Sequence, residues 1–283
     1  MRAFLTRLEQ ASGLDRLSDR LQGVVQATLK PQALRDALHG VWLGHPLHPV
    51  LVQLPVGAWM STAILDLLPG QRRGATALLA VGTAAAVPAA VAGANDWAAL
   101  DREQRRVGLA HVAGNSVAVA FFVASLAARL RGRHARGRTL SLIGLSAAGG
   151  SAYLGGHLAY KQAAQVNQAA TALHRIDEGW HPVADLAAVP DRQPVGRSIG
   201  EVSVLVYRDG DEVSVLLDRC AHQTGPLSDG RVVHVDGHAC VECPWHGSVF
   251  RLGDGEVVHG PAATDQPVLR TRVVDGVVEA CVP

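Results

Sequence analysis

Cys220-Ala-His-Gln-Thr-Gly-Pro-Leu227 and Cys243-Pro-Trp-His-Gly-Ser-Val-Phe250 are the two stretches that decide how the C-terminal part of this chain folds. Each carries one cysteine and one histidine, as C-x-H in the first and C-x-x-H in the second. Thiolates and imidazoles are ligands that zinc and iron share. In a zinc site the histidine pair usually follows the cysteine pair, whereas here the two residue types alternate. The pattern therefore favours a two-iron cluster, with two thiolates on one iron and two imidazoles on the other.

Both stretches resemble the paired cluster-binding loops of the Rieske 2Fe-2S family. The resemblance implies that Cys220 and Cys243 hold the inner iron, while His222 and His246 hold the outer iron near the protein surface. This mixed ligand set raises the reduction potential above that of an all-thiolate cluster. It also implies a set of neighbours that shape the loops, shield the cluster or donate hydrogen bonds to it: Gly225, Pro226, Trp245, Gly247 and Ser248.

The chain departs from the Rieske proteins of cytochrome bc type at three positions. Those proteins carry an extra cysteine in each loop, and the two form a disulfide, whereas this chain has Gly225 and Trp245 there. Ser248 matches a serine that donates a hydrogen bond to the cluster, but Phe250 replaces a tyrosine donor. Since such donors raise the potential, we predict a ferredoxin-like or oxygenase-component type of centre, with a potential in the lower half of the Rieske range.

Short strand-like runs separated by Asp-Gly pairs surround the two loops and predict an all-β domain of antiparallel strands. A Rieske oxygenase also needs a mononuclear iron held by two histidines and a carboxylate, and the residues after His246 contain no such set. We therefore expect an electron-transfer component rather than a complete oxygenase. Cys240 is expected to be a buried thiol on the strand before the second loop. The expected strands are 202–206, 213–217, 232–235, 268–272 and 277–282.

The first half of the chain is apolar, and it accounts for a content of 48% hydrophobic residues with only 4% aromatic ones. Residues 74–95, 107–128 and 139–160 contain no Asp, Glu, Lys or Arg, and 49–68 contains only Asp66. Each stretch reaches the ~20 residues that a helix needs to cross a bilayer. We expect an all-α bundle of four transmembrane helices; a buried soluble bundle is the alternative. The net charge of +1 gives no indication of nucleic-acid binding.

Polar side chains near the ends of these spans form a second candidate site. Gly44-His-Pro-Leu-His-Pro49 opens a region that resembles a family of bacterial membrane domains of uncharacterised function. Four spans would place its polar residues on the side of the C-terminal domain, and ionisable groups in spans often mark function. A b-type haem held by His111 and His157, a quinone site, a metal site and purely structural hydrogen bonds all remain open. The residues concerned are His45, His48, Asp96, His111 and His157.

The expected organisation is an amphipathic N-terminal helical segment (1–40), a four-span domain (41–160), a polar linker (161–182) and the Rieske domain (183–283). The N-terminal segment suits either a membrane surface or a partner helix. Arginines in 129–138 favour a cytoplasmic position for that loop, which would put both termini outside. Cluster assembly in the cytoplasm and the lack of a twin-arginine signal argue the other way, and we predict a cytoplasmic Rieske domain.

These features predict a protein of the bacterial cell membrane that relays single electrons. Its expected partners are the lipid bilayer and a redox protein that acts as donor or acceptor. One alternative is a membrane oxidoreductase that uses quinone or haem at the histidine face, and another is a redox sensor or anchoring subunit. The sequence does not decide whether the protein is itself an enzyme.

Overall fold

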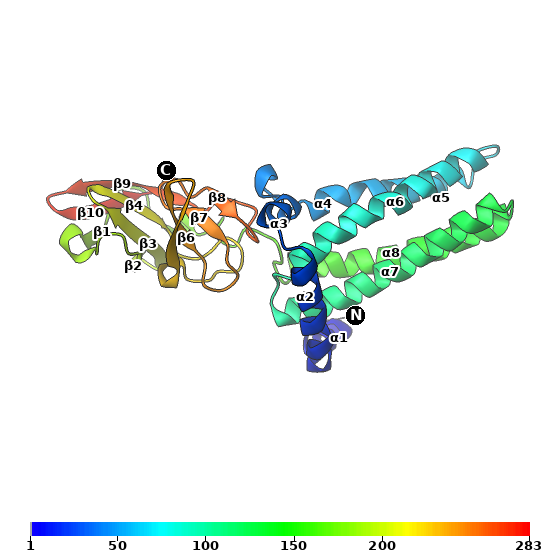
Figure 1. Ribbon diagram of the computed structural model, residues 1–283, viewed down its shortest axis with the longest axis horizontal. Coiled ribbons are helices and arrows are strands. Elements are labelled where there is room, and N and C mark those ends of the chain that lie inside the picture. Colours follow the sequence, from blue (N-terminus) through cyan, green and yellow to red (C-terminus); the bar gives the residue numbers. More distant parts are fainter. Residues whose placement is uncertain (1) are drawn as a thin grey trace. The chain divides into compact units, whose positions relative to one another are not determined.

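The computed structural model describes residues 2–283, and the chain divides into two compact units (Figure 1). The helical unit contains Met1–Lys30 and Leu47–Ala164, and the β unit contains Pro31–Pro46 and Gln165–Pro283. Residues 31–46 thus belong to the β unit, although they precede the helical bundle in the sequence. Nothing in the apolar pattern of the chain indicates that residues 31–46 belong to the β unit.

The helical unit is built on three long helices, α6, α7 and α8, and on the shorter pair α4 and α5, all of which follow the apolar stretches. Two helices among residues 2–283 are long and apolar enough to cross a membrane, α6 and α7. The four-span bundle is therefore not confirmed, because α5 has 13 residues and spans only about 20 Å. The bounds are α1 Arg2–Glu9, η1 Ser12–Leu14, α2 Asp15–Thr28, α4 His48–Leu51, α5 Gln53–Leu65, α6 Arg72–Trp97, α7 Arg102–Leu130 and α8 His134–Tyr160.

The interior of the bundle is made of small residues around one aromatic pair. The rings of Trp59 and Phe122 stack with their centroids 4.2 Å apart. Gly82 lies against this pair, since a Cβ there would come within 2.9 Å of the Trp59 ring. Larger apolar side chains such as Val87 and Val117 are exposed on the outside of the helices. The bundle thus has its small residues inside and its large apolar residues outside, as helices packed in a bilayer do.

A buried ion pair joins two helices of the bundle. Arg129, near the end of α7, donates from Nη1 to Asp66 Oδ1 at 2.8 Å and pairs with the second oxygen as well. Its Nε donates to Ser125 Oγ, which in turn is 2.8 Å from Ser141 Oγ on α8. The single charge that interrupts the first apolar stretch, Asp66, therefore has a structural partner.

The β unit consists of two antiparallel sheets with a common hydrophobic core. The sheet orders are β1-β10-β9-β4-β3-β2 and β5-β6-β7-β8. The five predicted strands are confirmed as β3, β4, β5, β9 and β10; strands β1, β2, β6, β7 and β8 were missed because they are short and mixed in character. The bounds are β1 His181–Asp185, β2 Val195–Ile199, β3 Val202–Asp209, β4 Glu212–Leu217, β5 Arg231–Val235, β6 His238–Glu242, β7 Val249–Arg251, β8 Val257–His259, β9 Val268–Val274 and β10 Val277–Cys281.

Two of the predicted Asp-Gly pairs form tight hairpin turns. Asp236 and Gly237 have φ values of 50° and 83°, and Asp275 and Gly276 have values of 49° and 79°. Two successive residues with positive φ give the hairpin turn that matches the twist of the strands. Asp229-Gly230 does not join a hairpin; it follows the first cluster loop, where Leu227–Asp229 forms the short 3-10 helix η5.

The polar segment after the bundle, predicted to be a linker, belongs to the β unit from Gln165 onward. Only one short 3-10 turn, η3 Leu173–Arg175, lies between residues 165 and 180. Ala169 and Ile176 are buried in the core of the β unit. The Gln168 amide donates to the Ala221 carbonyl at 2.8 Å, so this segment is hydrogen-bonded to the first loop.

Residues 31–46 pack on the same unit through α3 Gln32–His39 and η2 Val41–Leu43. Asp36 accepts hydrogen bonds from the Gly260 amide and from His259 Nδ1, both at 2.9 Å. A Cβ at Gly260 would lie 2.7 Å from the His39 ring, so glycine permits this close approach. The segment thus covers the chain that follows β8.

Candidate metal centre

The two cysteine and histidine loops lie at the ends of strands and fold back on themselves. The first loop follows β4, and the Cys220 amide donates to the Gly225 carbonyl at 2.9 Å. The second joins β6 to β7, and the Cys243 amide donates to the Ser248 carbonyl at 2.8 Å. Gly247 has a φ of 77°, a conformation that glycine adopts without strain. Each loop is therefore a tight turn that holds its cysteine in a fixed direction.

The four predicted ligands come together in two pairs of like chemistry. The thiols of Cys220 and Cys243 share a hydrogen bond. The rings of His222 and His246 are 5.1 Å apart between centroids and almost perpendicular. Among residues 2–283, no three His, Cys, Asp or Glu side chains converge as ligands of a single ion. Separate thiol and imidazole pairs match a centre with two irons better than one tetrahedral zinc.

The ionisation of the pairs follows from burial and from the shared hydrogen bond. The hydrogen bond to Cys243, together with burial, raises the pKa of Cys220 well above that of an ordinary thiol. The same bond stabilises the Cys243 thiolate and lowers its pKa to about 7. Burial lowers the pKa of His222 to about 3, so that its ring is neutral, which is the form that binds a metal.

The polar atoms of the histidines fit an iron-sulfur centre. Both ring nitrogens of His222 are buried without a hydrogen-bond partner in the protein. Buried nitrogens without partners are costly, and metal coordination removes that cost. Gly225 leaves room beside the thiols, because a Cβ there would lie 2.9 Å from Cys243 Sγ and 3.0 Å from the Trp245 ring. The residues present therefore suit a 2Fe-2S cluster.

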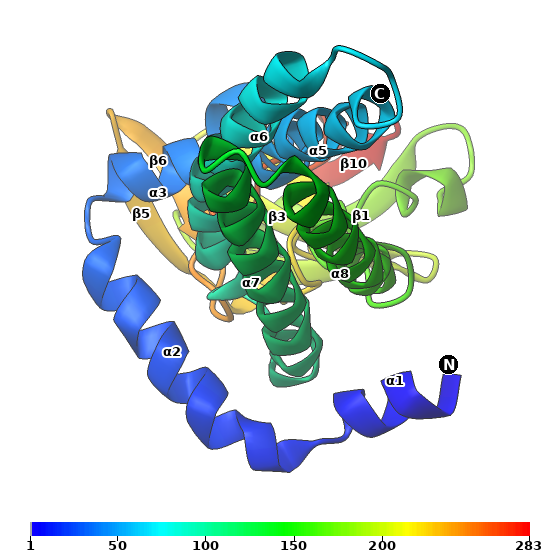
Figure 2. The same cartoon turned by 90° about the vertical axis from the view of Figure 1, so that its right-hand side faces the viewer.

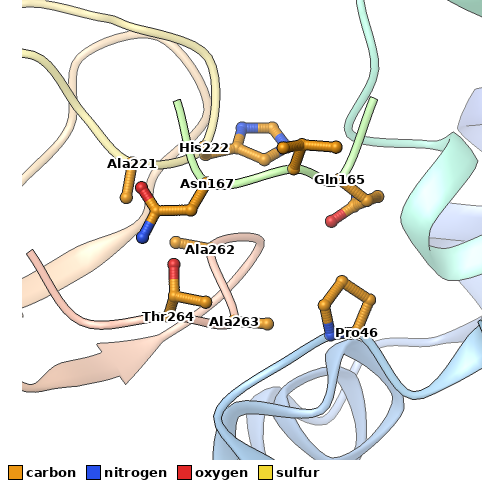
Figure 3. Close-up of a pocket in the computed structure, with 9 residues that line it drawn as sticks. Pro46, Gln165, Asn167, Ala221, His222, Ala262, Ala263 and Thr264 are labelled. Carbon is orange, nitrogen blue, oxygen red and sulfur yellow. The ribbon is translucent and has the colours of Figure 1, made fainter. Parts of the chain in front are cut away.

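The exposure of the two histidines differs, which the sequence did not predict. His246 is partly exposed, and its neighbour Trp245 is exposed. His222 is only 3% exposed, so the expectation that both imidazoles lie at the surface is wrong for this residue. A small pocket separates His222 from Pro46 and Ala263 (Figure 3). Segments distant in sequence, 46 and 165–167, line this pocket and limit access to His222.

Two buried polar residues, Ser248 and Gln266, support the loops by hydrogen bonds. Ser248 is fully buried, and its Oγ accepts the Ala262 amide at 2.9 Å. Gln266 was missed: its Nε2 donates to the Leu217 and Arg219 carbonyls, and its Oε1 accepts the Ala221 amide. A glutamine outside both loops has no distinguishing local signal. Its role depends on the tertiary approach of 266 to the first loop.

The thiol of Cys240 lies outside this arrangement, as expected. The residue is fully buried on β6, and burial raises its pKa. Its Sγ contacts the His238 carbonyl at 3.6 Å. Cys240 therefore behaves as a core thiol.

Comparison with known proteins agrees with this geometry. Residues 179–272 match the Rieske [2Fe-2S] domain family. The ferredoxin subunit of anthranilate 1,2-dioxygenase from Burkholderia cepacia is 35% identical over 100 residues, which are 35% of this chain and 89% of that protein. The chain belongs to the Rieske [2Fe-2S] family.

Two further relatives define how far the likeness extends. Ferredoxin CarAc from Metapseudomonas resinovorans is 33% identical over 98 residues, which cover 33% of this chain and 87% of that protein. The oxygenase component of dicamba O-demethylase from Stenotrophomonas maltophilia is 42% identical over 87 residues, 30% of this chain. The chain covers only 24% of the length of that oxygenase component. The likeness is thus to whole ferredoxins and to one part of an oxygenase.

The helical part has a match of its own, because residues 44–168 match a family described as a predicted membrane protein (DUF2231). This match and the two apolar helices α6 and α7 indicate membrane association. The description carries no activity, so the function of this part rests on its residues.

The polar residues of the helical unit are hydrogen-bonded to the protein. His48 Nδ1 lies 2.8 Å from the Ala89 carbonyl, and His111 Nδ1 lies 2.8 Å from the Ser151 carbonyl. The other ring nitrogen of His111 lies 3.1 Å from Asn115 Nδ2. His157 Nε2 lies 2.7 Å from Glu9 Oε1. Asp96 is buried in the helical unit, whereas His45 belongs to the β unit. These contacts fit a structural role and give no support to haem or quinone binding.

Proposed function

We propose that this protein is a membrane-anchored Rieske electron-transfer protein that relays single electrons between a redox partner and an acceptor. The observation that carries the proposal is the pairing of two thiols with two imidazoles, of which the buried one, His222, has no hydrogen-bond partner in the protein for either ring nitrogen. A bound 2Fe-2S cluster would supply one-electron transfer. Cys220 and Cys243 would hold one iron, and His222 and His246 the other.

His246 would be the side of the centre that faces a redox partner. His222 is covered by its own unit, whereas His246 is partly exposed beside the exposed Trp245. An exposed aromatic ring next to a ligand offers an apolar contact for a docking protein. Since two relatives are named as ferredoxins, one of them a dioxygenase subunit, the partner class we propose is a redox protein such as a reductase or an oxygenase component.

The helical unit would anchor this centre to the bilayer with four spans, α5 being extended by α4. Only 22% of the most apolar window of α6 and 28% of that of α7 are buried. The core helix of a soluble bundle would instead be mostly buried. Exposed apolar helices of this length therefore support contact with lipid. We place the Rieske unit in the cytoplasm of a bacterial cell, where iron-sulfur clusters are assembled.

The test compares two cysteines of the C-x-x-C sequence in the full chain, purified in detergent. The dithionite-reduced wild-type protein should give a Rieske EPR signal, and Cys243→Ser should abolish it. Cys240→Ser is the matched control, since it removes a buried thiol three residues away and should keep the signal. The proposal would be contradicted if Cys243→Ser kept the Rieske signal as Cys240→Ser does. A fully metallated wild-type protein without a Rieske signal would also contradict it.

The anchoring and its sidedness are tested separately in cells. The protein should stay in the membrane fraction after washing at high salt and alkaline pH. A reporter that works only in the cytoplasm should be active when it is fused after Pro283. Activity of a reporter that works only outside the cell would show that the sidedness is the reverse.

A further inference from the structure

The polar face of α2 is turned toward the helical bundle. Asp15, Ser18, Asp19 and Gln22 are three or four residues apart and therefore share one face of the helix. Gln22 Nε2 donates to the Ala98 carbonyl at 2.7 Å. The orientation of α2 is thus fixed by hydrogen bonds to the end of α6.

Consecutive arginines at the start of α7 make the other bonds to this face. Arg106 donates to both carboxylate oxygens of Asp15, at 2.7 and 2.8 Å. Arg105, which is buried, donates to Ser18 Oγ at 3.0 Å and to Asp19 at 2.6 Å. Because these arginines are held in place by α7, the charged face of α2 is directed inward.

The apolar stripe of α2 is on the opposite side and has no cover within the helical unit. Leu17, Leu21 and Val24 follow helical spacing and are 51%, 39% and 60% exposed. An amphipathic helix of a water-soluble protein directs such a stripe into the core. Here the stripe faces outward, and Arg16 and Arg20 flank it on the exposed side.

The direction of α2 matches a helix that lies in the plane of a membrane surface. Figures 1 and 2 agree that α2 runs across the long axes of α7 and α8. It contacts the bundle at Ala98 and residues 102–106, where the apolar part of α6 ends and that of α7 has not yet begun. In a bilayer spanned by α6 and α7, this level would lie at the boundary between the acyl chains and the headgroups.

The short helix α1 continues the same arrangement. Glu9 at its end accepts hydrogen bonds from Lys161 Nζ at 2.6 and 2.9 Å and lies 2.7 Å from His157 Nε2. Phe4 is exposed. α1 therefore has one apolar residue, Leu5, buried and another, Phe4, exposed, and its attachment through Glu9 resembles the charged attachment of α2.

We propose that α2 is an interfacial helix, with Leu17, Leu21 and Val24 in the acyl-chain boundary of the bilayer and Arg16 and Arg20 at the lipid phosphates. The apolar helices α6 and α7 of the same unit are also mostly exposed, which identifies lipid as the occupant of this stripe. Arginines that flank an apolar stripe place their charge at the headgroups while the stripe enters the apolar layer. The proposal rests on the membrane anchoring proposed above.

The test measures the depth of single spin labels in the full chain reconstituted in phospholipid nanodiscs. Cysteines are introduced as Leu21→Cys and Val24→Cys on the stripe, Gln26→Cys as an exposed control on the same helix, and Val117→Cys on the exposed side of α7. The four native cysteines are buried, and wild-type protein treated with the label gives the background. Collisions with oxygen report lipid, and collisions with a water-soluble nickel chelate report water.

Labels at Leu21 and Val24 should show high oxygen accessibility and lose most collisions with nickel, relative to the label at Gln26. Nickel collisions equal to those at Gln26 would place the stripe in water and overturn the proposal. Low accessibility to both reagents would mean that a protein covers the stripe, which would also overturn it. If the label at Val117 is in water as well, the membrane anchoring itself has failed, so the two failures are distinguishable.

Discussion

Removal of the Asp36 carboxylate should detach residues 31–46 from the β unit. Asp36 accepts hydrogen bonds from the buried Gly260 amide and from His259 Nδ1, each at 2.9 Å, and its side chain is only slightly exposed. The helix α3 has eight residues, and a helix of this length is unstable on its own. Local opening of α3 is therefore expected to depend strongly on this carboxylate.

The magnitude follows from the hydrogen bonds that Gly260 and His259 make to Asp36. A third hydrogen bond to this carboxylate, from Gln32 Nε2 at 2.8 Å, lies within α3 and does not join the helix to the rest of the β unit. A hydrogen bond to a charged group contributes about 1.5–3 kcal/mol, and a buried amide left without a partner costs about 1–3 kcal/mol. The His259 ring is partly exposed and regains water, so its share is small. We therefore estimate about 2–4 kcal/mol for Asp36→Ala, which corresponds to an opening about 30 to 1,000 times more frequent. Asp36→Asn keeps one oxygen acceptor and should have a smaller effect.

Hydrogen exchange measured by mass spectrometry on the detergent-purified full chain is the appropriate assay. Peptides covering α3 should exchange faster in Asp36→Ala by the estimated factor, while peptides of the central strand β3 should be unchanged. Asp211→Ala, which removes an exposed carboxylate in the β3–β4 turn, is the control. Exchange of α3 that is no faster than in this control would refute the reasoning, because α3 would then not depend on Asp36.

Three further predictions concern other parts of the chain. Ser248→Ala should keep the cluster but lower its reduction potential by about 45 mV, as measured in an EPR redox titration. The reason is that the lost hydrogen bond stabilised the reduced cluster by about 1 kcal/mol. An unchanged potential would exclude the serine as a hydrogen-bond donor to the cluster. The hydrogen bond from Lys161 lowers the pKa of Glu9 below its ordinary value of 4.5, so its stabilisation is complete above that value and is lost as the pH falls through the lowered pKa. Proteolysis of α1 should accordingly increase in acid, and Glu9→Gln should remove that dependence. Asp66→Ala leaves the buried Arg129 without its carboxylate and should cost about 3–5 kcal/mol in the thermal stability of the helical unit, whereas the additional change Arg129→Ala should recover part of the loss.

The strands and the loops of the β unit were predictable because their signals are local. Alternating apolar residues identified β3, β4, β5, β9 and β10, and turn pairs such as Asp275-Gly276 fixed the hairpins through their positive φ values. Strands of three residues, such as β7 and β8, lack a detectable alternation. They form because β6 supplies hydrogen-bond partners to β7, and β7 in turn supplies them to β8.

The apolar stretches of the first half predicted helices, but their length did not decide how many cross a membrane. Residues 49–68 are divided between α4 and α5, and α5 has 13 residues. Asp66 was treated as an interruption, although its buried partner Arg129 lies in a different helix. Pairing between residues so far apart depends on helix packing and leaves no local signal.

By itself, the sequence identified the Rieske domain and predicted its four ligands, because two cysteines and two histidines at short spacing are typical of the cluster-binding loops whatever surrounds them. It also determined that the first half is helical and apolar. Only the tertiary structure decided that residues 31–46 and 165–180 pack on the β unit, that His222 is covered while His246 is not, and that the charged face of α2 is directed inward. The physical reason is that ligand type and periodicity are properties of neighbouring residues, whereas exposure and orientation depend on which distant surfaces come together.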